Sequence, residues 1–407
     1  MAKQYIINAL DIGSGSIKLI SVAKTPGEET FEILAQEQAP SLGVRKGVVI
    51  NNQEVAQTIS SLVEKASRSC NRRIDNVYAN VGGGHIHSTC SKGLVSVSRA
   101  DRKISEEDVE RVLQAARAVS LCSNNEIINT FPKEFIVDGE GGVKQVVGME
   151  GVRLEAEALL LCGFSPYIKN SSQSIVNSGL AINELVPDPL VCSKAVLTPR
   201  EKELGVCVLD IGAGTTSMAV FEEGNLIHAV ILPVGSGHIT NDIAICLKTD
   251  IDTAEKIKIE FGTCKNVSKK DKKGKKIKLE GDESLSFSTN LLRDIVDARV
   301  CEIFNLVDKE LKKISRQEML PAGVVLTGGG AKLPGIKDVA KRELKLPCRI
   351  GIPKGLPGFQ SDLSMASLLG LVLEGAEEEE RNVRFSRWHI PDKAKGIFKS
   401  IANIFIP

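Results

Sequence analysis

The sequence predicts an α/β protein of two lobes, because one strand–turn–strand unit occurs in it twice. Residues 10–18 read LDIGSGSIK and residues 209–216 read LDIGAGTT, each bounded by short apolar runs. A third glycine turn, at residues 327–330, follows another apolar run and precedes a helix expected from Ile336. The chain of 407 residues is also longer than a single hydrophobic core usually supports.

Composition narrows the classes of function. The formal net charge is +1 and aromatic residues make up only 4%, whereas nucleic-acid binders have a basic excess or stacking platforms, so we expect no nucleic-acid partner. The ten cysteines include no C-x-x-C pair, which is typical of reduced thiols in a cytosolic protein. A strand expected at the very start leaves no room for a signal peptide, and no apolar run is long enough for a transmembrane helix.

The duplicated turns carry the residue types that bind a polyphosphate with its metal ion. Glycines let successive backbone N–H groups approach phosphate oxygens, and serine or threonine hydroxyls add donors. Aspartate at the end of a buried strand suits a hydrated Mg²⁺. One copy alone would fit an ordinary glycine hairpin equally well, and the second copy favours phosphate binding. The predicted phosphate-binding residues are Asp11, Gly13, Ser14, Gly15, Ser16, Lys18, Asp210, Gly212, Gly214, Thr215 and Thr216, with Asp11 and Asp210 near the metal through water.

The three glycine turns resemble those of the actin-like ATPase superfamily, in which two hairpins clamp the phosphates of a nucleotide. The resemblance covers nearly the whole chain and implies two ribonuclease H-like lobes with ATP and Mg²⁺ between them. It also implies that the adenosine lies on Gly328, Gly329 and Gly330, since adjacent glycines let a flat purine approach the backbone.

Two further segments are predicted to contact the adenosine. Gly235 precedes a helix whose free N–H groups favour an anion, and the superfamily has a related stretch there. Glu255 and Lys258 lie three residues apart on one helical face. By the resemblance they hold the ribose hydroxyls and the adenine, although a plain surface ion pair would have the same spacing.

Residues 85–164 resemble the inserted domain of one family in this superfamily, the bacterial cell-division protein FtsA. The resemblance rests on ISEEDV at 104–109, on Pro132 with VDG at 137–139, and on GMEGVRLE at 148–155. It implies that the inserted domain contacts a neighbouring subunit in a filament and other division proteins.

The remaining boundaries follow from the apolar runs. The core of the first lobe is expected at residues 1–84, completed by 165–197 and 362–373. The second lobe is expected to have its core at 198–231 and 296–361, with a smaller subdomain at 232–295.

Helical periodicity marks two expected interdomain helices, at residues 168–185 and 362–371. Gly370 in the second helix would let the lobes pack closely. Gln173 in the first could orient a hydrolytic water, but an exposed helix glutamine fits equally well, so no catalytic residue is assigned. Two prolines end the first helix, and a strand is expected at 191–197.

A long amphipathic helix is expected at residues 288–313. By the family resemblance, this helix helps to receive the C-terminal tail of FtsZ, the tubulin-like ring protein, and Arg299 matches the arginine there. A guanidinium suits a peptide carboxylate because it donates two parallel hydrogen bonds. Upstream, residues 265–278 contain eight lysines, which predict a solvated loop or, alternatively, a surface for an acidic partner or anionic lipid.

The end of the chain predicts a membrane anchor. Residues 374–392, with four successive glutamates, are expected to be a flexible connector, and residues 393–407 have an apolar helical face beside lysines. A helix of about 13 residues is roughly 20 Å long, too short to span a membrane, so it would lie among anionic headgroups or dock on the protein itself. FtsA-like proteins end in such an anchor. The predicted membrane-binding residues are Ile397, Phe398, Ile401, Ile404, Phe405, Lys395 and Lys399.

These features together predict an ATP-binding, actin-like protein that polymerises and tethers FtsZ filaments to the cytoplasmic face of the membrane at the division septum, with at most slow ATP hydrolysis. Two alternatives stay open: the actin-like adaptor of type IV pilus assembly and a small-molecule kinase of the superfamily. The kinase would need a catalytic base and would not explain the amphipathic end.

Overall fold

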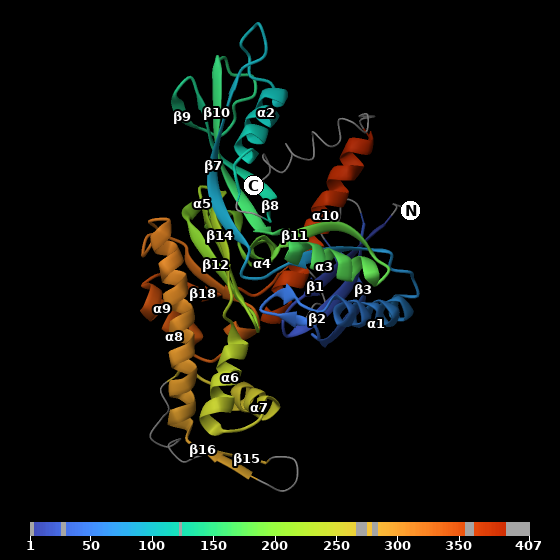
Figure 1. The fold of residues 1–407 in the computed structure, drawn as a ribbon, viewed down its shortest axis with the longest axis vertical. Coiled ribbons are helices and arrows are strands. Elements are labelled where there is room, and N and C mark those ends of the chain that lie inside the picture. The colour runs from blue at the N-terminus through green and yellow to red at the C-terminus, as the bar shows by residue number, and fades with distance from the viewer. Residues whose placement is uncertain are drawn as a thin grey trace.

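The structure is a computed structural model that describes residues 4–25, 30–121, 124–265, 275–278, 284–354 and 362–387. Two lobes lie side by side, and a subdomain extends away from them along the long axis of the molecule (Figure 1). Lobe 1 contains the elements from β1 to β3 at the right of the view, and lobe 2 contains β12 to β14 at the left.

A five-stranded mixed sheet forms lobe 1, in the order β11-β6-β1-β2-β3. β1 pairs antiparallel with β2, which pairs with β3, whereas β6 and β11 are parallel to β1. A short hairpin, β4 and β5, follows β3. The bounds are β1 Tyr5–Ile12, β2 Ser16–Lys24, β3 Phe31–Pro40, β4 Val44–Arg45, β5 Val48–Val49, β6 Asn76–Val81 and β11 Ala181–Pro187.

The sheet of lobe 2 repeats this topology, as the duplicated motif predicted. β12 pairs antiparallel with β13, β13 with β14, and β17 and β18 continue parallel to β12. The bounds are β12 Val206–Ile211, β13 Thr216–Glu222, β14 Asn225–Leu232, β17 Gly323–Thr327 and β18 Cys348–Ile350.

The inserted subdomain extends the sheet of lobe 2 through one paired position, His87 with Val230. A capping box of Ser105 and Asp108 begins its helix α2, which covers the strands of the subdomain. Gly93 makes this packing possible, because a Cβ there would lie 2.0 Å from the Val112 carbonyl oxygen of α2. The bounds are β7 His87–Ser96, α2 Glu106–Arg117, β8 Asn125–Val137, β9 Glu140–Val143 and β10 Arg153–Phe164.

Helices cover both lobes. In lobe 1 these are α1 Asn52–Cys70 and α3 Ser165–Asn177. Lobe 2 carries α5 Pro199–Leu204, α6 Ser236–Leu247, α7 Ile251–Phe261, α8 Thr289–Lys313, the 3₁₀ turn η2 Gly329–Lys332, and α9 Ile336–Leu344, together with the hairpin β15 Lys275–Lys278 and β16 Ser284–Phe287. The boundary expected between residues 295 and 296 falls inside α8. The lysine-rich loop expected at 265–278 is also partly a strand, β15.

The first interdomain helix ends earlier than the sequence predicted. α3 ends at Asn177, Gly179 turns the chain with φ +88°, and residues 181–187 form the edge strand β11. The expected strand at 191–197 is instead the helix α4 (Asp188–Val196). Pro189 lies in the first turn of α4, where the N–H that proline lacks would have no helical partner. The proline that we expected to end one helix therefore lies at the start of another.

The second interdomain helix, α10 (Ala366–Arg387), continues through the segment expected to be a connector. Its glutamates pair with lobe 1: Lys194 Nζ lies 2.6 Å from both Glu374 Oε2 and Glu377 Oε2, and Lys24 Nζ lies 2.5 Å from Glu380 Oε1. Apposed lysines therefore stabilise a helix that like charges alone would disfavour. The tail at 393–407 lies outside the described residues.

One apolar core joins the two lobes. Alternate residues of β1, including Ile7 and Ala9, and alternate residues of β12, including Val206 and Val208, pack around α4 and α10. The opposite faces pack on α1 and α3 in lobe 1 and on α8 and α9 in lobe 2. The close packing expected at Gly370 is confirmed, because a Cβ there would lie 1.9 Å from the Val191 carbonyl oxygen of α4.

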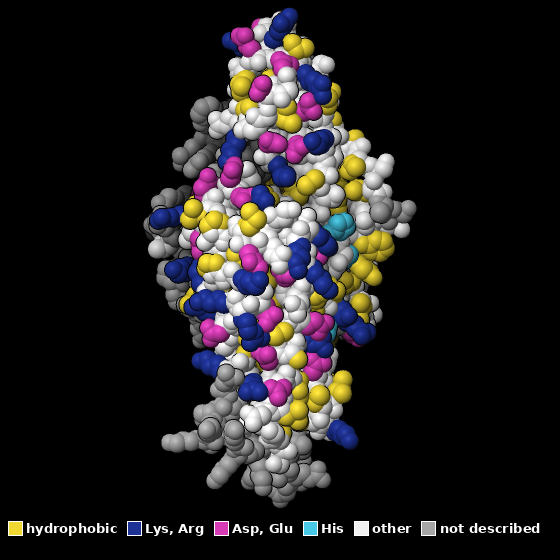
Figure 2. Space-filling view, turned by 90° about the vertical axis from the view of Figure 1, so that its left-hand side faces the viewer, with side chains coloured by type: hydrophobic (Ala, Val, Ile, Leu, Met, Phe, Trp, Pro, Cys, Tyr) yellow, Lys and Arg dark blue, Asp and Glu magenta, His cyan; other side chains and the backbone are white. Residues whose placement is uncertain are grey.

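Charges of both signs alternate over the face formed by lobe 2 and the inserted subdomain, without a large region of one sign (Figure 2). Among the helices of the described residues, none has both the length and the apolar character that a membrane span needs.

Candidate functional site

The two duplicated turns touch each other between the lobes. Each is closed by the same hydrogen bond, from Gly13 N to Ser16 O at 3.1 Å and from Gly212 N to Thr215 O at 2.9 Å. A Cβ on Gly15 would lie 3.0 Å from Ala213 Cβ of the other turn. Local sequence therefore forms two equivalent hairpins, and the shared core of the lobes brings them together.

A cavity of about 510 Å³ opens beside the paired turns. Its walls come from the ends of β1, β6 and β12, from the first turns of α4 and α6, and from the glycine turn after β17. These strands are parallel and end at one edge of each sheet, which is where α/β folds bind ligands. Of the predicted residues, the cavity is lined by Asp11, Gly13, Ser14, Gly15, Ser16, Lys18, Asp210, Gly212, Thr215, Glu255, Lys258, Gly328, Gly329 and Gly330.

Three predicted residues support the cavity without lining it. The Thr216 hydroxyl is buried and donates to Val234 O at 2.8 Å. A Cβ on Gly214 would lie 2.6 Å from Ser14 Oγ, and one on Gly235 would lie 2.6 Å from Gly212 O. Gly214 and Gly235 therefore allow backbone segments to approach closely.

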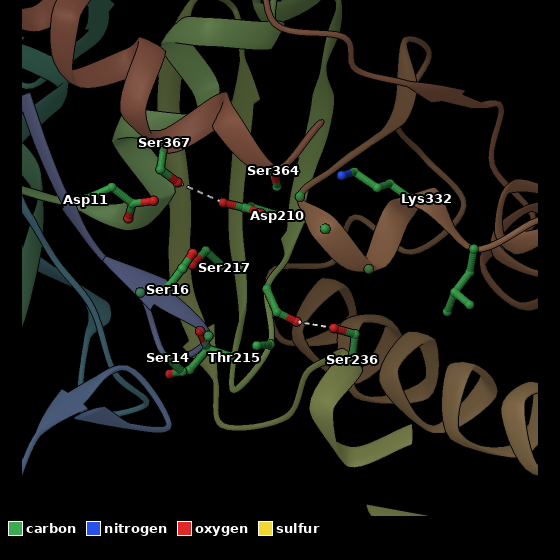
Figure 3. Close-up of a pocket in the computed structure, with 18 of the residues that line it drawn as sticks. Asp11, Ser14, Ser16, Asp210, Thr215, Ser217, Ser236, Lys332, Ser364 and Ser367 are labelled. Atoms are coloured by element: carbon green, nitrogen blue, oxygen red, sulfur yellow. Dashed lines mark hydrogen bonds between the residues drawn. The ribbon is translucent and has the colours of Figure 1, made fainter. Parts of the chain in front are cut away.

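Carboxyl groups gather at one end of the cavity. Lys18 Nζ donates to Asp11 Oδ2 at 2.7 Å, and the Asn80 amide donates to both Asp11 Oδ1 at 3.0 Å and Asp188 Oδ1 at 2.7 Å. Ser367 Oγ of α10 donates to Asp210 Oδ2 at 3.0 Å (Figure 3). One end of the cavity therefore combines carboxylates from both lobes with a lysine.

Burial changes the protonation of this cluster. It raises the pKa of Asp210 to about 6, with the Ser367 hydrogen bond opposing the change, and raises that of Asp188 well above its usual range, with Asp11 adding to the effect. Burial alone would lower the pKa of Lys18, but Asp11 outweighs it and raises the pKa. Nearby carboxyls that resist ionisation favour an added cation.

The donor set fits a hydrated Mg²⁺. Carboxylate and hydroxyl oxygens are the hard ligands this ion prefers. Within the described residues, no group of three or more His, Cys, Asp or Glu is arranged to hold a metal by itself. An ion near Asp11 and Asp210 would therefore take its other ligands from water and from a phosphate.

The glycine turn at residues 328–330 and two apolar side chains line the other part of the cavity, which we call the slot. Gly328 has φ +86°, and a Cβ on Gly330 would lie 2.5 Å from Ile211 Cγ2, so side chains are excluded where the turn meets β12. Ile259 and Leu333 add apolar walls. A polar end followed by a slot walled by glycines and apolar side chains matches the shape of a nucleoside polyphosphate.

Two models of protein families match this chain. One, described as Cell division protein FtsA, matches residues 207–370, and the other, an SHS2 domain inserted in FTSA, matches residues 83–162. The FtsA of Pseudomonas aeruginosa is 33% identical over 94% of this chain and 92% of its own length, and that of Neisseria meningitidis is 35% identical over 88% and 86%. This chain belongs to the FtsA family.

Solved structures support the fold expected for an FtsA-family protein. The chain resembles a PilM–PilN type IV pilus biogenesis complex with a TM-score of 0.63 at 18% identity, covering 91% of this chain and 98% of the other. It resembles MreB5 of Spiroplasma citri bound to ADP with a TM-score of 0.54 at 12% identity, covering 93% and 98%. The predicted actin-like α/β architecture with its inserted domain is therefore confirmed.

In this FtsA-family structure the cavity also contains polar residues that the sequence analysis missed. Asn80 lies one residue before the end of β6, and Asp188 begins α4. Asp188 was missed because residues 191–197 were predicted to be a strand, whereas nothing in the local pattern of β6 singled out Asn80. Several hydroxyl side chains lie around the carboxyl cluster (Figure 3). They occur at strand ends and in first helical turns, and this placement is the feature of the sequence that could have predicted them. Those beyond the predicted ones are Ser217, Ser236, Ser364 and Ser367.

Two other residues considered from the sequence, Gln173 and Arg299, lie outside the cavity. Gln173 is exposed on α3 and does not line it, so the structure gives no support to a role in orienting water. Arg299 on α8 donates from Nε and Nη2 to the two carboxylate oxygens of Asp242 on α6, at 2.7 and 2.8 Å. The fork expected to receive a peptide carboxylate is thus already paired within the protein.

Proposed function

We propose that this FtsA-family protein binds ATP with Mg²⁺ in the cavity between its lobes, polymerises, and tethers FtsZ filaments to the cytoplasmic face of the membrane at the division septum. The observation that carries the proposal is the meeting of two equivalent hairpin turns over one cavity, with a glycine-walled slot in its other part. The phosphates would lie on the turns and the adenosine on residues 328–330. With Gln173 outside the cavity, we expect at most slow hydrolysis.

Isothermal titration calorimetry with ATP tests the proposed binding of nucleotide. We expect uptake that depends on Mg²⁺ and that weakens at least tenfold in Asp11→Asn or Asp210→Asn, since each removes a charge facing the ion. Asp101→Asn, on an exposed turn of the inserted subdomain, is the matched control. Absence of Mg²⁺-dependent binding in the native chain would contradict the proposal.

The FtsZ tail would dock along α6 and α8. These helices carry the Arg299–Asp242 pair and expose the apolar side chains Ile245 and Leu291, which are 74% and 45% accessible. Exposed apolar side chains beside a charged pair suit a short peptide with both apolar and acidic residues. Arg299→Glu is expected to abolish binding of a labelled FtsZ tail peptide in fluorescence anisotropy, whereas Arg68→Glu on α1 leaves it unchanged.

The membrane part rests on residues 393–407, with the apolar face of Ile397, Phe398, Ile401, Ile404 and Phe405 flanked by Lys395 and Lys399. A cut after Arg387 is the appropriate truncation, because a cut at Glu374 would also remove ion pairs to lobe 1. We expect the full chain, but not this truncation, to sediment with anionic vesicles.

Polymerisation and the pilus alternative share the same assay. With ATP, lipid and FtsZ present, we expect filaments of the full chain that carry FtsZ into the vesicle pellet, with residues 85–164 contacting the neighbouring subunit and other division proteins. Equal sedimentation of the full and truncated chains would instead favour a cytoplasmic adaptor, as in the type IV pilus reading.

A further inference from the structure

A closed triangle of polar side chains lies behind the slot of the cavity. Lys258 of α7 donates from Nζ to Thr240 Oγ1 of α6 at 2.9 Å and lies 2.6 Å from Glu255 Oε2 of α7. Thr240 Oγ1 in turn donates to Glu255 Oε2. Lys258 also reaches Ser236 O at 3.4 Å. Glu255 and Lys258 line the cavity, whereas Thr240 is 3% accessible and lies behind them.

The chemistry of the three groups determines the direction of each hydrogen bond. An ammonium has three N–H donors and no acceptor, so the Thr240 oxygen must accept from Lys258. Its own proton is then free to point only toward the Glu255 carboxylate. Lys258 has an acceptor for each of its N–H groups, which leaves none for a ligand.

Glu255 is therefore the member of the triangle that is available to a ligand. Its Oε2 accepts a hydrogen bond from Thr240 and pairs with the Lys258 ammonium. Within the described residues its Oε1 has no hydrogen-bond partner. The Glu255 side chain is 43% accessible, against 10% for Lys258. A carboxylate oxygen held in place at the slot accepts hydrogen bonds, and the hydroxyls of a ribose are donors of the matching kind.

We propose that Thr240 is a positioning residue that orients Glu255 toward the ribose, so that the site prefers ribonucleotides to 2′-deoxyribonucleotides. This inference rests on the proposed function, since it places the nucleoside of ATP in the slot. Thr240 acts by lowering the rotational freedom of Glu255, because a carboxylate already held in position loses less entropy when it binds a hydroxyl. A site built to receive a hydroxyl also discriminates against the ligand that lacks it.

Binding of ATP and of 2′-deoxy-ATP, each with Mg²⁺, tests the proposal by calorimetry on the full chain. For the native protein we expect ATP to bind about tenfold more tightly than 2′-deoxy-ATP, the effect of one hydrogen bond to a charged group. In Thr240→Val, which keeps the shape and removes the hydroxyl, the ratio of the two dissociation constants should fall to about twofold. Thr240→Ser restores the hydroxyl and should restore the ratio.

Two further variants separate positioning from a structural effect. Thr249→Val, on the turn after α6 and outside the cavity, is the matched control and should keep the native ratio. If Thr240→Val fails to fold, Glu255→Gln tests the same step, because it removes the charge of the acceptor and should also lower the ratio.

The outcomes separate this inference from the proposed function. A native-like ratio in Thr240→Val, or a ratio in Thr240→Ser as low as in the valine variant, would overturn the role of Thr240 while leaving ATP binding intact. A native protein that binds ATP and 2′-deoxy-ATP equally would overturn the ribose contact. Absence of binding by either nucleotide would overturn the proposed function itself.

Discussion

Gly370 lies where α10 crosses α4, and its replacement by alanine tests how the lobes are joined. A Cβ there would lie 1.9 Å from the Val191 carbonyl oxygen, about 1.5 Å short of an ordinary contact, which begins near 3.4 Å. Overpacking of this kind costs roughly 1–3 kcal/mol, and more where the neighbour is rigid backbone. In an exposed helix the replacement of glycine by alanine would stabilise the protein by about 1 kcal/mol. A loss of stability at Gly370 would therefore show that the two helices are in close contact there.

We expect Gly370→Ala to lower the free energy of unfolding by about 2 kcal/mol, which corresponds to roughly 5 °C in the thermal midpoint for a lobe of this size. ATP affinity should fall as well, because separating the helices moves Asp188 and Ser367, which both line the cavity. Differential scanning fluorimetry and calorimetry measure the two effects. Gly141→Ala is the control, since a Cβ there meets nothing closer than 3.6 Å. An alanine variant as stable as the native chain would refute the reasoning.

Three other perturbations follow from the ion pairs. Asp242→Asn removes the carboxylate that pairs with Arg299 Nε and Nη2 and leaves only the Glu302 pair at Nη1. It should strengthen binding of the FtsZ tail peptide severalfold, whereas weaker binding would mean that Asp242 holds the arginine in its binding position. Burial alone would raise the pKa of Glu201, but hydrogen bonds from Arg349 and Thr198 outweigh burial and lower the pKa to about 2. This carboxylate therefore stabilises the fold above its unfolded pKa near 4.5, and the contribution is lost as the pH falls toward 2. Glu201→Gln should reduce the acid-induced loss of unfolding free energy by no more than about 3 kcal/mol, as measured by denaturant titrations at successive pH values. Lys194→Ala leaves two glutamates of α10 without their shared cation and should speed proteolysis beyond residue 374, while an unchanged rate would show that apolar packing alone holds the helix.

The duplicated turns were predictable because their chemistry is local. Both copies have Asp, Gly and a hydroxyl residue in the same order, and the closing hydrogen bonds from Gly13 and Gly212 are equivalent. The glycine turn at 327–330 and the long helix α8 were equally visible, since each depends on neighbouring residues only.

The prediction for residues 178–197 was wrong for the opposite reason. β11 is a strand because it pairs with β6, and α4 is a helix because it fills the space between the lobes, so both states depend on partners distant in sequence. The prediction of a flexible connector at the acidic stretch of α10 was wrong for the same reason. Lys24 and Lys194 neutralise glutamates that, considered alone, suggest a solvated segment.

By itself the sequence determined the two-lobed class, the positions of the duplicated turns and the resemblance to the FtsA family, since these rest on short contiguous patterns. Only the tertiary structure decided that Asn80 and Asp188 join the carboxyl cluster, that Thr240 lies behind Glu255, and that Asp242 occupies Arg299. Each of these contacts joins separate elements, and the direction in which a side chain points across such a junction is determined by packing rather than by its neighbours along the chain.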